Sequence, residues 1–238
     1  MNTEFVAPTE ILAPDKERVF GAAELATLMM AVEGPSTPQS LIASGLDPKF
    51  FGDTARAAGL SSLVARGWYQ LRQQGESAQL VPTSDALAIG VAASRAQAWV
   101  QISAMQDRDT TLSTYVVTRA LDLDLVAAEG ALETWRVDAV DEQEGVVGFI
   151  SGVLDNLLDE YAEGALFIRI MRAGVDDAHT LYVRTHPSSA TDGDGERCYQ
   201  IAESKHITDD LQVVDAVYTD DDLEERLDDL TALDDDAE

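Results

Sequence analysis

The chain has 238 residues, with 16 basic and 44 acidic side chains and a formal net charge of −28 at pH 7. That length can bury a full core, and 45% hydrophobic with 25% charged residues is an ordinary globular composition. No apolar run reaches the roughly 18 residues of a membrane span, and MNTEFVAPTE at the start does not resemble a secretory signal. The single cysteine, Cys198, excludes an internal disulfide framework and a cysteine-rich zinc site. We therefore expect a cytoplasmic protein without membrane contact.

The acidic charge is unevenly distributed along the chain. Residues 1–96 carry a net charge of −3, whereas residues 97–238 carry −25. Residues 209–238 alone contain 14 acids and one base, Arg226. Nucleic-acid binding needs a basic surface that releases counterions from the phosphates. The charge distribution therefore disfavours a nucleic-acid partner.

The N-terminal part of the chain combines helical periodicity with turn residues. Residues 1–20 contain two prolines and little periodicity, which predicts a flexible lead-in. Residues 21–96 show apolar side chains at helical spacing and then two short strands around a polar turn. Gly67 fits the position after a helix C-terminus, and Asp47 before Pro48 is typical of a helix start. The predicted elements are helices at 22–32, 38–44 and 61–67, strands at 68–73 and 78–83, and a further helix with Ser84 as its candidate N-cap.

Three helices followed by a two-stranded hairpin are the layout of a winged helix. Such a segment can bind DNA, or it can serve as a packing or protein-contact module. DNA-binding winged helices place several basic side chains on the recognition helix and the wing. The segment 53–73 offers only Arg56, Arg66 and Arg72, which favours the second interpretation.

The rest of the chain is predicted to contain two related units, each with four strands and one helix. The tetrapeptide VDAV occurs at 137–140 and again at 214–217, both times just before an acidic helix start. This duplication predicts an α+β fold with antiparallel sheets and pseudo-twofold symmetry. The first unit, 97–162, has predicted strands at 97–105, 112–120, 123–130 and 131–140, with a tight turn at Glu129-Gly130, and a helix at 142–162. The second unit, 163–233, has predicted strands at 165–173, 179–186, 196–204 and 211–218 and a helix at 220–233, and an acidic tail, 234–238, follows it.

The three histidines do not have the spacing of a metal site. His179 and His186 are seven residues apart on one predicted strand, which places them on opposite faces of the sheet. His206 lies further along, and no pair shows standard zinc spacing. We expect all three to be surface or hairpin-end histidines.

Asp192, Asp194 and Glu196 resemble the opening of a calcium-binding loop. The EF-hand pattern requires glycine at position six and glutamate at position twelve. Position six is Arg197, and position twelve is Glu203, inside a predicted strand. A flexible hairpin loop is the better interpretation.

No catalytic motif is present. The sequence lacks a G-x-S-x-G elbow, a P-loop and a G-x-G-x-x-G fingerprint, and Cys198 is expected to be a buried structural thiol. We therefore predict no enzymatic activity, no catalytic residue, no cofactor and no metal.

Aromatic residues recur along the predicted strands, and most are expected in the core. Some of them are candidates for an exposed sheet face that binds a partner, because aromatic side chains anchor protein interfaces. The candidates are Trp68, Trp99, Tyr115, Trp135, Phe149, Phe167, Tyr182 and Tyr199.

The layout resembles the EspG-type proteins of actinobacterial type VII (ESX) secretion. The winged-helix-like segment is matched by LSSLVARGWYQL and LVPTSDALAIG, and the strand meander by WVQISAM, LSTYVVTRA, LDLVAAEG and ETWRVDAV. The resemblance covers residues 20–233 as a layout. It implies a cytosolic chaperone without catalysis that holds the hydrophobic tip of a secreted PPE-type helical hairpin, usually in a PE–PPE pair. It identifies no binding residue in this sequence.

The leading hypothesis is a non-enzymatic binding protein, a secretion chaperone for a PPE- or WXG-type helical partner. One alternative is a winged-helix transcriptional regulator with a C-terminal sensor domain. Another is an acidic protein that mimics nucleic acid and occupies a basic partner. The partner, the oligomeric state and the sheet face that binds stay open at this point.

Overall fold

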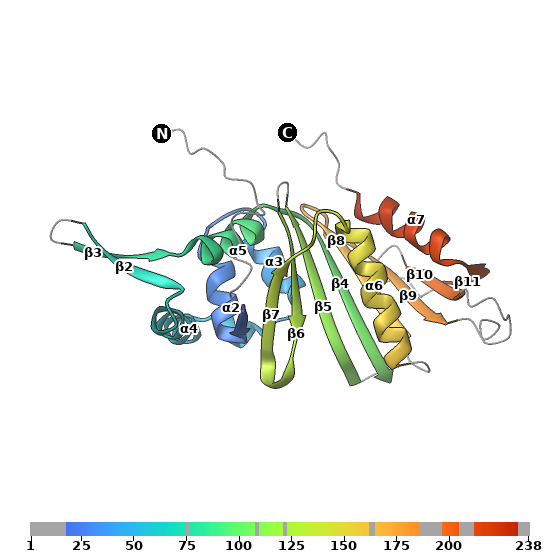
Figure 1. The fold of residues 1–238 in the computed structure, drawn as a ribbon, viewed down its shortest axis with the longest axis horizontal. Helices are drawn as coiled ribbons and strands as arrows, with labels where there is room; N and C mark the ends of the chain where they lie inside the picture. Colours follow the sequence, from blue (N-terminus) through green and yellow to red (C-terminus); the bar gives the residue numbers. More distant parts are fainter. Residues whose placement is uncertain are drawn as a thin grey trace. The chain divides into compact units, whose positions relative to one another are not determined.

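The computed structural model describes residues 18–74, 77–107, 110–120, 123–161, 165–185, 197–204 and 212–232. These residues form a mixed α+β fold with a large antiparallel sheet of nine strands and a separate hairpin of two (Figure 1). The α+β class with antiparallel strands that the sequence predicts is therefore confirmed. None of the described helices has both the length and the apolar character needed to cross a membrane.

The helices and strands follow one another largely where the sequence places them. The helices are α2 (Ala22–Met29), α3 (Thr37–Ala43), α4 (Asp53–Ala65), α5 (Ser84–Arg95), α6 (Gly145–Glu160) and α7 (Asp220–Thr231), with 3-10 turns η1 (Pro48–Phe51) and η2 (Ala131–Glu133). The strands are β1 (Val19–Gly21), β2 (Tyr69–Gln74), β3 (Ser77–Pro82), β4 (Ala96–Asp107), β5 (Thr110–Ala120), β6 (Leu123–Glu129), β7 (Thr134–Ala139), β8 (Ala165–Arg172), β9 (Ala178–Thr185), β10 (Tyr199–Ser204) and β11 (Gln212–Tyr218).

The strand order of the large sheet is β1-β7-β6-β5-β4-β8-β9-β10-β11, and β2 pairs only with β3. The chain runs through four strands and a helix twice, from β4 to α6 and from β8 to α7. The pseudo-twofold relation between these two segments stays a prediction.

The chain packs as two compact units. The first contains the described residues up to Gln97 together with Thr118–Ala139, and the second contains Ala98–Val117 together with the described residues from Val140 onward. Helices α2 to α5 and the β2–β3 hairpin thus belong to the first unit. Helices α6 and α7 and strands β8 to β11 belong to the second. The segment boundaries expected from the sequence, among them 96/97 and 162/163, stay predictions.

Helices α2 and α4 pack closely in the first unit. A Cβ atom added at Gly59 of α4 would lie 2.4 Å from the carbonyl oxygen of Ala23 and 2.5 Å from Oγ1 of Thr27. Only glycine permits this backbone approach. Most of α2 is buried, including Leu25 and Leu28, so this helix forms the centre of the unit.

The end of α4 starts the hairpin with a well-defined turn. Gly67 has a φ of +77°, and its N–H donates to the carbonyl of Val64 at 3.0 Å, while the Trp68 N–H donates to that of Leu63 at 2.8 Å. This pair of hydrogen bonds is the Schellman motif, which confirms the predicted role of Gly67. Trp68 and Leu63 are both buried, and the Trp68 ring meets that of Phe20 edge to face.

Two local predictions need correction. Thr83, not Ser84, is the N-cap of α5, because its side chain accepts from the Ala86 N–H at 3.4 Å. Thr83 and Ser84 are both good capping residues, so sequence alone does not separate them. The reversal between β6 and β7 is also longer than a tight turn at Glu129-Gly130, because η2 intervenes with Leu132 at a φ of +60°.

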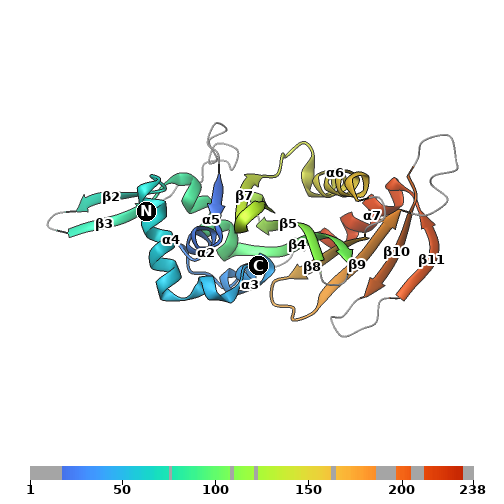
Figure 2. The ribbon, with the colours of Figure 1, turned by 90° about the horizontal axis from the view of Figure 1, so that it is seen from below.

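The sheet of the second unit is covered on one side by α6 and α7 (Figures 1 and 2). Ile102 of β4, Ile168 of β8 and Leu181 of β9 lie side by side across three strands, and all three are fully buried. The apolar faces of the helices complete this core, with Ile150, Val153, Leu154, Leu157 and Leu158 from α6 and Leu223 and Leu227 from α7.

Candidate protein-binding surface

The other side of this sheet is the candidate site, which we call the open face. Side chains of successive strand residues point to opposite faces, and Tyr199 and Glu203 contact the helices, with the Tyr199 hydroxyl near Asp155 of α6 and Glu203 paired with Arg226 of α7. Residues of the other parity therefore point away from α6 and α7. The partly or fully exposed members of this open face are Gln101, Ser103, Phe167, Arg169, Thr180, Tyr182, Arg184, Gln200 and Val217.

An aromatic pair lies at the centre of the open face. Phe167 of β8 and Tyr182 of β9 are directly opposite in register, and their rings meet edge to face with centroids 5.2 Å apart. Both are only partly buried. Val217 of β11 pairs with Gln200 on the same face and is 51% exposed. Apolar surface therefore stays accessible on this side of the sheet.

The open face carries positive charge and no carboxylate among its described side chains. Arg184 donates from Nε to Oε1 of Gln200 at 2.7 Å, and a neutral amide positions the guanidinium without neutralising it. Arg169 follows Phe167 by two residues on β8, so both side chains lie on the same face. Arg169 makes no ion pair with a described residue. The described side chains of this face thus carry positive charge, although the net charge of the chain is −28.

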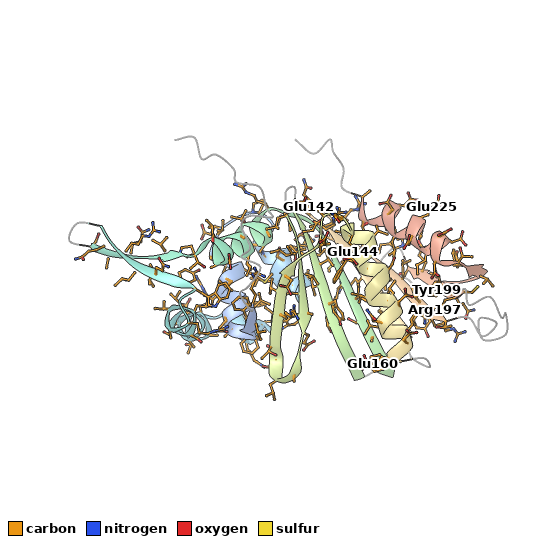
Figure 3. All side chains as sticks on the ribbon, viewed as in Figure 1. Glu142, Glu144, Glu160, Arg197, Tyr199 and Glu225 are labelled. Atoms are coloured by element: carbon orange, nitrogen blue, oxygen red, sulfur yellow. The ribbon has the colours of Figure 1, made fainter. Side chains whose placement is uncertain are left out.

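The acidic side chains gather on the opposite side of the same unit. Figure 3 shows Glu142 and Glu144 before α6, Glu160 at its end and Glu225 on α7. The solvent-facing residues of the two helices include Asp155, Asp159, Glu160, Asp221, Asp222, Glu224, Glu225, Asp228 and Asp229.

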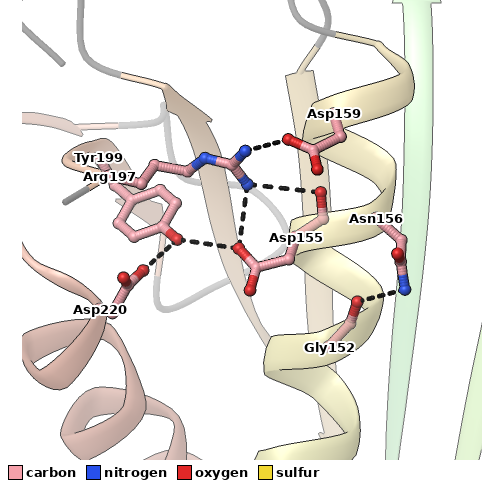
Figure 4. A network of polar contacts seen from close by, with 7 residues as sticks. All are labelled: Gly152, Asp155, Asn156, Asp159, Arg197, Tyr199 and Asp220. Carbon is pink, nitrogen blue, oxygen red and sulfur yellow. Dashed lines mark hydrogen bonds and ion pairs between the residues drawn. The ribbon is translucent and has the colours of Figure 1, made fainter. Parts of the chain in front are cut away.

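A polar network fastens β10 to these helices (Figure 4). The Tyr199 hydroxyl donates to the carboxylates of Asp220 and, at 3.4 Å, Asp155. Arg197 pairs through Nη1 with Asp155 at 3.0 Å and through Nη2 with Asp159. Burial raises the pKa of Tyr199, and the hydrogen bond to Asp220 with the nearby negative charges raises it further. Tyr199 thus keeps its proton at neutral pH and donates its hydroxyl hydrogen to these carboxylates.

His179 takes part in a second contact between the sheet and α7. Its Nε2 lies 2.7 Å from Oε1 of Glu203, and the same oxygen accepts from Nη2 of Arg226 at 2.5 Å. Within the described ranges, no group of three or more His, Cys, Asp or Glu side chains could hold a metal ion. His186 and His206 lie outside the described residues.

The sequence also singles out an acidic loop and the single cysteine. Asp192, Asp194 and Glu196 fall outside the described residues. Cys198 precedes β10 instead of lying within a strand, and it is partly exposed instead of buried. β10 begins at Tyr199, three residues after the predicted start at residue 196, so the predicted place of Cys198 in a buried strand is wrong.

The basic residues of the winged-helix-like segment are mostly engaged within the first unit. Arg66 contacts Glu24 at 2.6 Å and donates to the Val19 carbonyl at 2.7 Å, and Arg56 lies 3.9 Å from Asp53. Burial alone would raise the pKa of Glu24, but hydrogen bonds from Ser62, the Gly21 N–H and Arg66, with the charge of Arg66, lower it below the usual value. Glu24 is therefore ionised and neutralises Arg66.

No family model matches the chain, and no curated protein matches it.

The sequence predicts two of the nine partly or fully exposed open-face residues as partner-binding candidates. Phe167 and Tyr182 are among the eight aromatic candidates, but Arg169 and Arg184 were not selected. Each arginine stands two residues after an aromatic, in F-I-R and Y-V-R. That shared spacing on two neighbouring strands is the signal that places all four on one face.

Proposed function

We propose that this chain is a non-enzymatic binding protein whose open face holds an apolar segment of a protein partner. The observation that carries the proposal is the partly exposed Phe167–Tyr182 pair on a face whose described side chains include no carboxylate. Burying a carboxylate in an interface costs free energy unless it is paired. The described side chains of the open face carry no acid, so desolvating them avoids this cost.

The side-chain types on the open face also suit protein binding. Aromatic residues and arginine are enriched in the cores of interfaces, and aspartate and glutamate are depleted there. Arg169 and Arg184 lie beside the aromatic pair and fit carboxylates or carbonyl groups at the edge of a bound apolar segment. The partner surface we propose has an apolar tip with hydrogen-bond acceptors around it.

The layout that resembles EspG-type proteins supports a more specific form of the proposal. In this form the protein acts in the cytoplasm as a chaperone for a secreted helical hairpin of PPE or WXG type, and its open face covers the apolar tip until secretion. The pairing of Arg66 with Glu24 and of Arg56 with Asp53 makes the DNA-binding regulator a weaker alternative, because these guanidinium groups are partly neutralised.

The test is capture of the partner from the native cell with matched variants. The wild-type chain, a Phe167→Ser/Tyr182→Ser variant and a Val175→Ser control are purified in parallel, and the bound proteins are identified by mass spectrometry. Val175 is a 46% exposed apolar residue of the same unit outside the open face. We expect the wild type and the control to retain a secreted helical protein in stoichiometric amount, and the double variant to lose at least about 90% of it.

Two results would contradict the proposal. Equal capture by all three proteins would show that the open face does not bind the partner. Capture of a basic partner that dissociates at high salt, in the same amount by the wild type and the double variant, would also contradict it. That result would point instead to the acidic sides of α6 and α7, as a nucleic-acid mimic requires. Thermal unfolding of each variant checks that the fold is kept.

A further inference from the structure

The β2–β3 hairpin of the first unit is a second apolar surface. Its six residue pairs run from Tyr69–Pro82 to Gln74–Ser77 without a register shift. Leu71 lies directly opposite Leu80, and alternation places Tyr69 and Pro82 on the same side of the ribbon. We call this side the ribbon face, and its members are Tyr69, Leu71, Gln73, Ala78, Leu80 and Pro82.

The ribbon face is exposed although the hairpin is firmly anchored. Leu71 is 69% exposed and Leu80 is 36% exposed. At the base, the carbonyl of the buried Trp68 accepts from the Thr83 N–H at 2.9 Å. Figure 1 shows the two strands running away from α2, α4 and α5. An isolated two-stranded ribbon is only marginally stable in water, so this hairpin gains from a surface that covers its leucines.

The hairpin also lacks the charge that dominates the chain. Its described residues include one arginine, Arg72, and no carboxylate, and residues 1–96 carry a net charge of only −3. Two molecules of net charge −28 repel each other through most of their surface. If the two molecules make contact through their hairpins, they meet where this repulsion is weakest.

We propose that the protein forms a twofold homodimer in which the ribbon faces of two hairpins pack against each other. The ribbon face has no charged side chain that would select a charged partner. It is compatible with itself, because an isologous contact sets Leu71 and Leu80 of one copy against the same leucines of the other. The polar side chains Gln70, Arg72 and Gln79 point away from the contact and stay hydrated. Each copy contributes its own open face, so the dimer binds two partner molecules if the proposed function holds.

The test is the solution mass of the full chain, measured by light scattering and sedimentation over a range of protein and salt concentrations. We expect a species of twice 25.7 kDa that is favoured by salt, because screening weakens the repulsion. Leu71→Gln/Leu80→Gln is expected to raise the dimer dissociation constant at least about 30-fold. Ile42→Gln, at a 68% exposed residue of α3, is the control and should leave it unchanged.

Cross-linking keeps the proposal testable if the leucine variant disturbs the hairpin. In a Cys198→Ser background, Ala78→Cys on the ribbon face should form an intermolecular disulfide under mild oxidation, whereas Gln70→Cys on the opposite side should not. A monomeric wild type at all concentrations, or cross-linking at Gln70→Cys alone, would overturn the dimer. Partner capture depends on Phe167 and Tyr182 instead, so the two proposals fail separately.

Discussion

The two faces of the sheet in the second unit differ in both packing and charge. One face is covered by α6 and α7 and holds fully buried aliphatic residues such as Ile168 and Leu181. The solvent-facing side of these two helices carries many carboxylates. The other face leaves Phe167 and Tyr182 partly exposed and carries two arginines without a described carboxylate. The net charge of a segment therefore does not describe each of its surfaces. The acidic half of this chain thus contains a face whose described side chains include no carboxylate.

The largest expected difference is in stability, between substitutions at Leu181 and Tyr182, which are neighbours on β9 and point to opposite faces. Leu181 is fully buried beneath the helices, and Leu181→Ala should lower the free energy of unfolding by about 2–5 kcal/mol. Tyr182→Ala, on the open face, should lower it by less than half as much, because that side chain is already partly in water. Urea unfolding of both variants measures the difference.

For partner binding, we expect the larger loss from Tyr182→Ala and the smaller loss from Leu181→Ala. Tyr182→Ala is expected to reduce capture of the partner strongly, and Leu181→Ala is expected to retain it at temperatures where the variant stays folded. Equal losses of stability for the two variants would mean that both faces are core, and the distinction between them would be wrong.

The helix-covered face depends on polar fastening as well as on aliphatic packing. Tyr199→Phe removes the hydrogen bonds to Asp155 and Asp220 and should cost about 1–1.5 kcal/mol at pH 7. The pKa of Tyr199 is raised in the folded state, so this contribution is complete below the unfolded tyrosine pKa of about 10 and is lost as the pH rises further.

The pH dependence gives this prediction a control. Unfolding free energies of the wild type and Tyr199→Phe are compared between pH 7 and pH 11. The gap between them should narrow above about pH 10. A gap that is constant over this range would show that the hydroxyl is not held by the two carboxylates.

Much of the fold follows from local sequence patterns, whereas the identity of the two faces does not. Alternation in ALFIRIMR predicts β8 and shows that Phe167 and Arg169 share a side. Both sides of that strand contain apolar residues, with Leu166 and Ile168 on one and Phe167 and Met171 on the other. Which side the helices cover is decided by packing between distant segments, and no local pattern reports it.

Breaking the ion pair that holds α7 on the helix-covered face should cost less stability than losing the Tyr199 hydroxyl. Arg226 joins α7 to Glu203 of β10, and both side chains are partly exposed, so Arg226→Gln should cost only about 0.5–1 kcal/mol. The change should concentrate in α7, and hydrogen exchange of its amides is expected to quicken more than that of α6. Uniformly faster exchange across both helices would contradict a local role for this pair.

The smallest expected change in stability comes from neutralising single aspartates at the two ends of the acidic helix α7. Asp221 lies in the first turn, where the helix dipole favours a negative charge, and Asp229 lies in the last turn, where the dipole disfavours it. Asp221→Asn should therefore destabilise the protein and Asp229→Asn should stabilise it, each by about 0.3–0.5 kcal/mol at low salt. Both effects should shrink at 1 M salt, because screening weakens interactions between exposed charges. If both variants stabilise equally, general repulsion among the acids outweighs the dipole, and the acidic side of the unit acts as one continuous field.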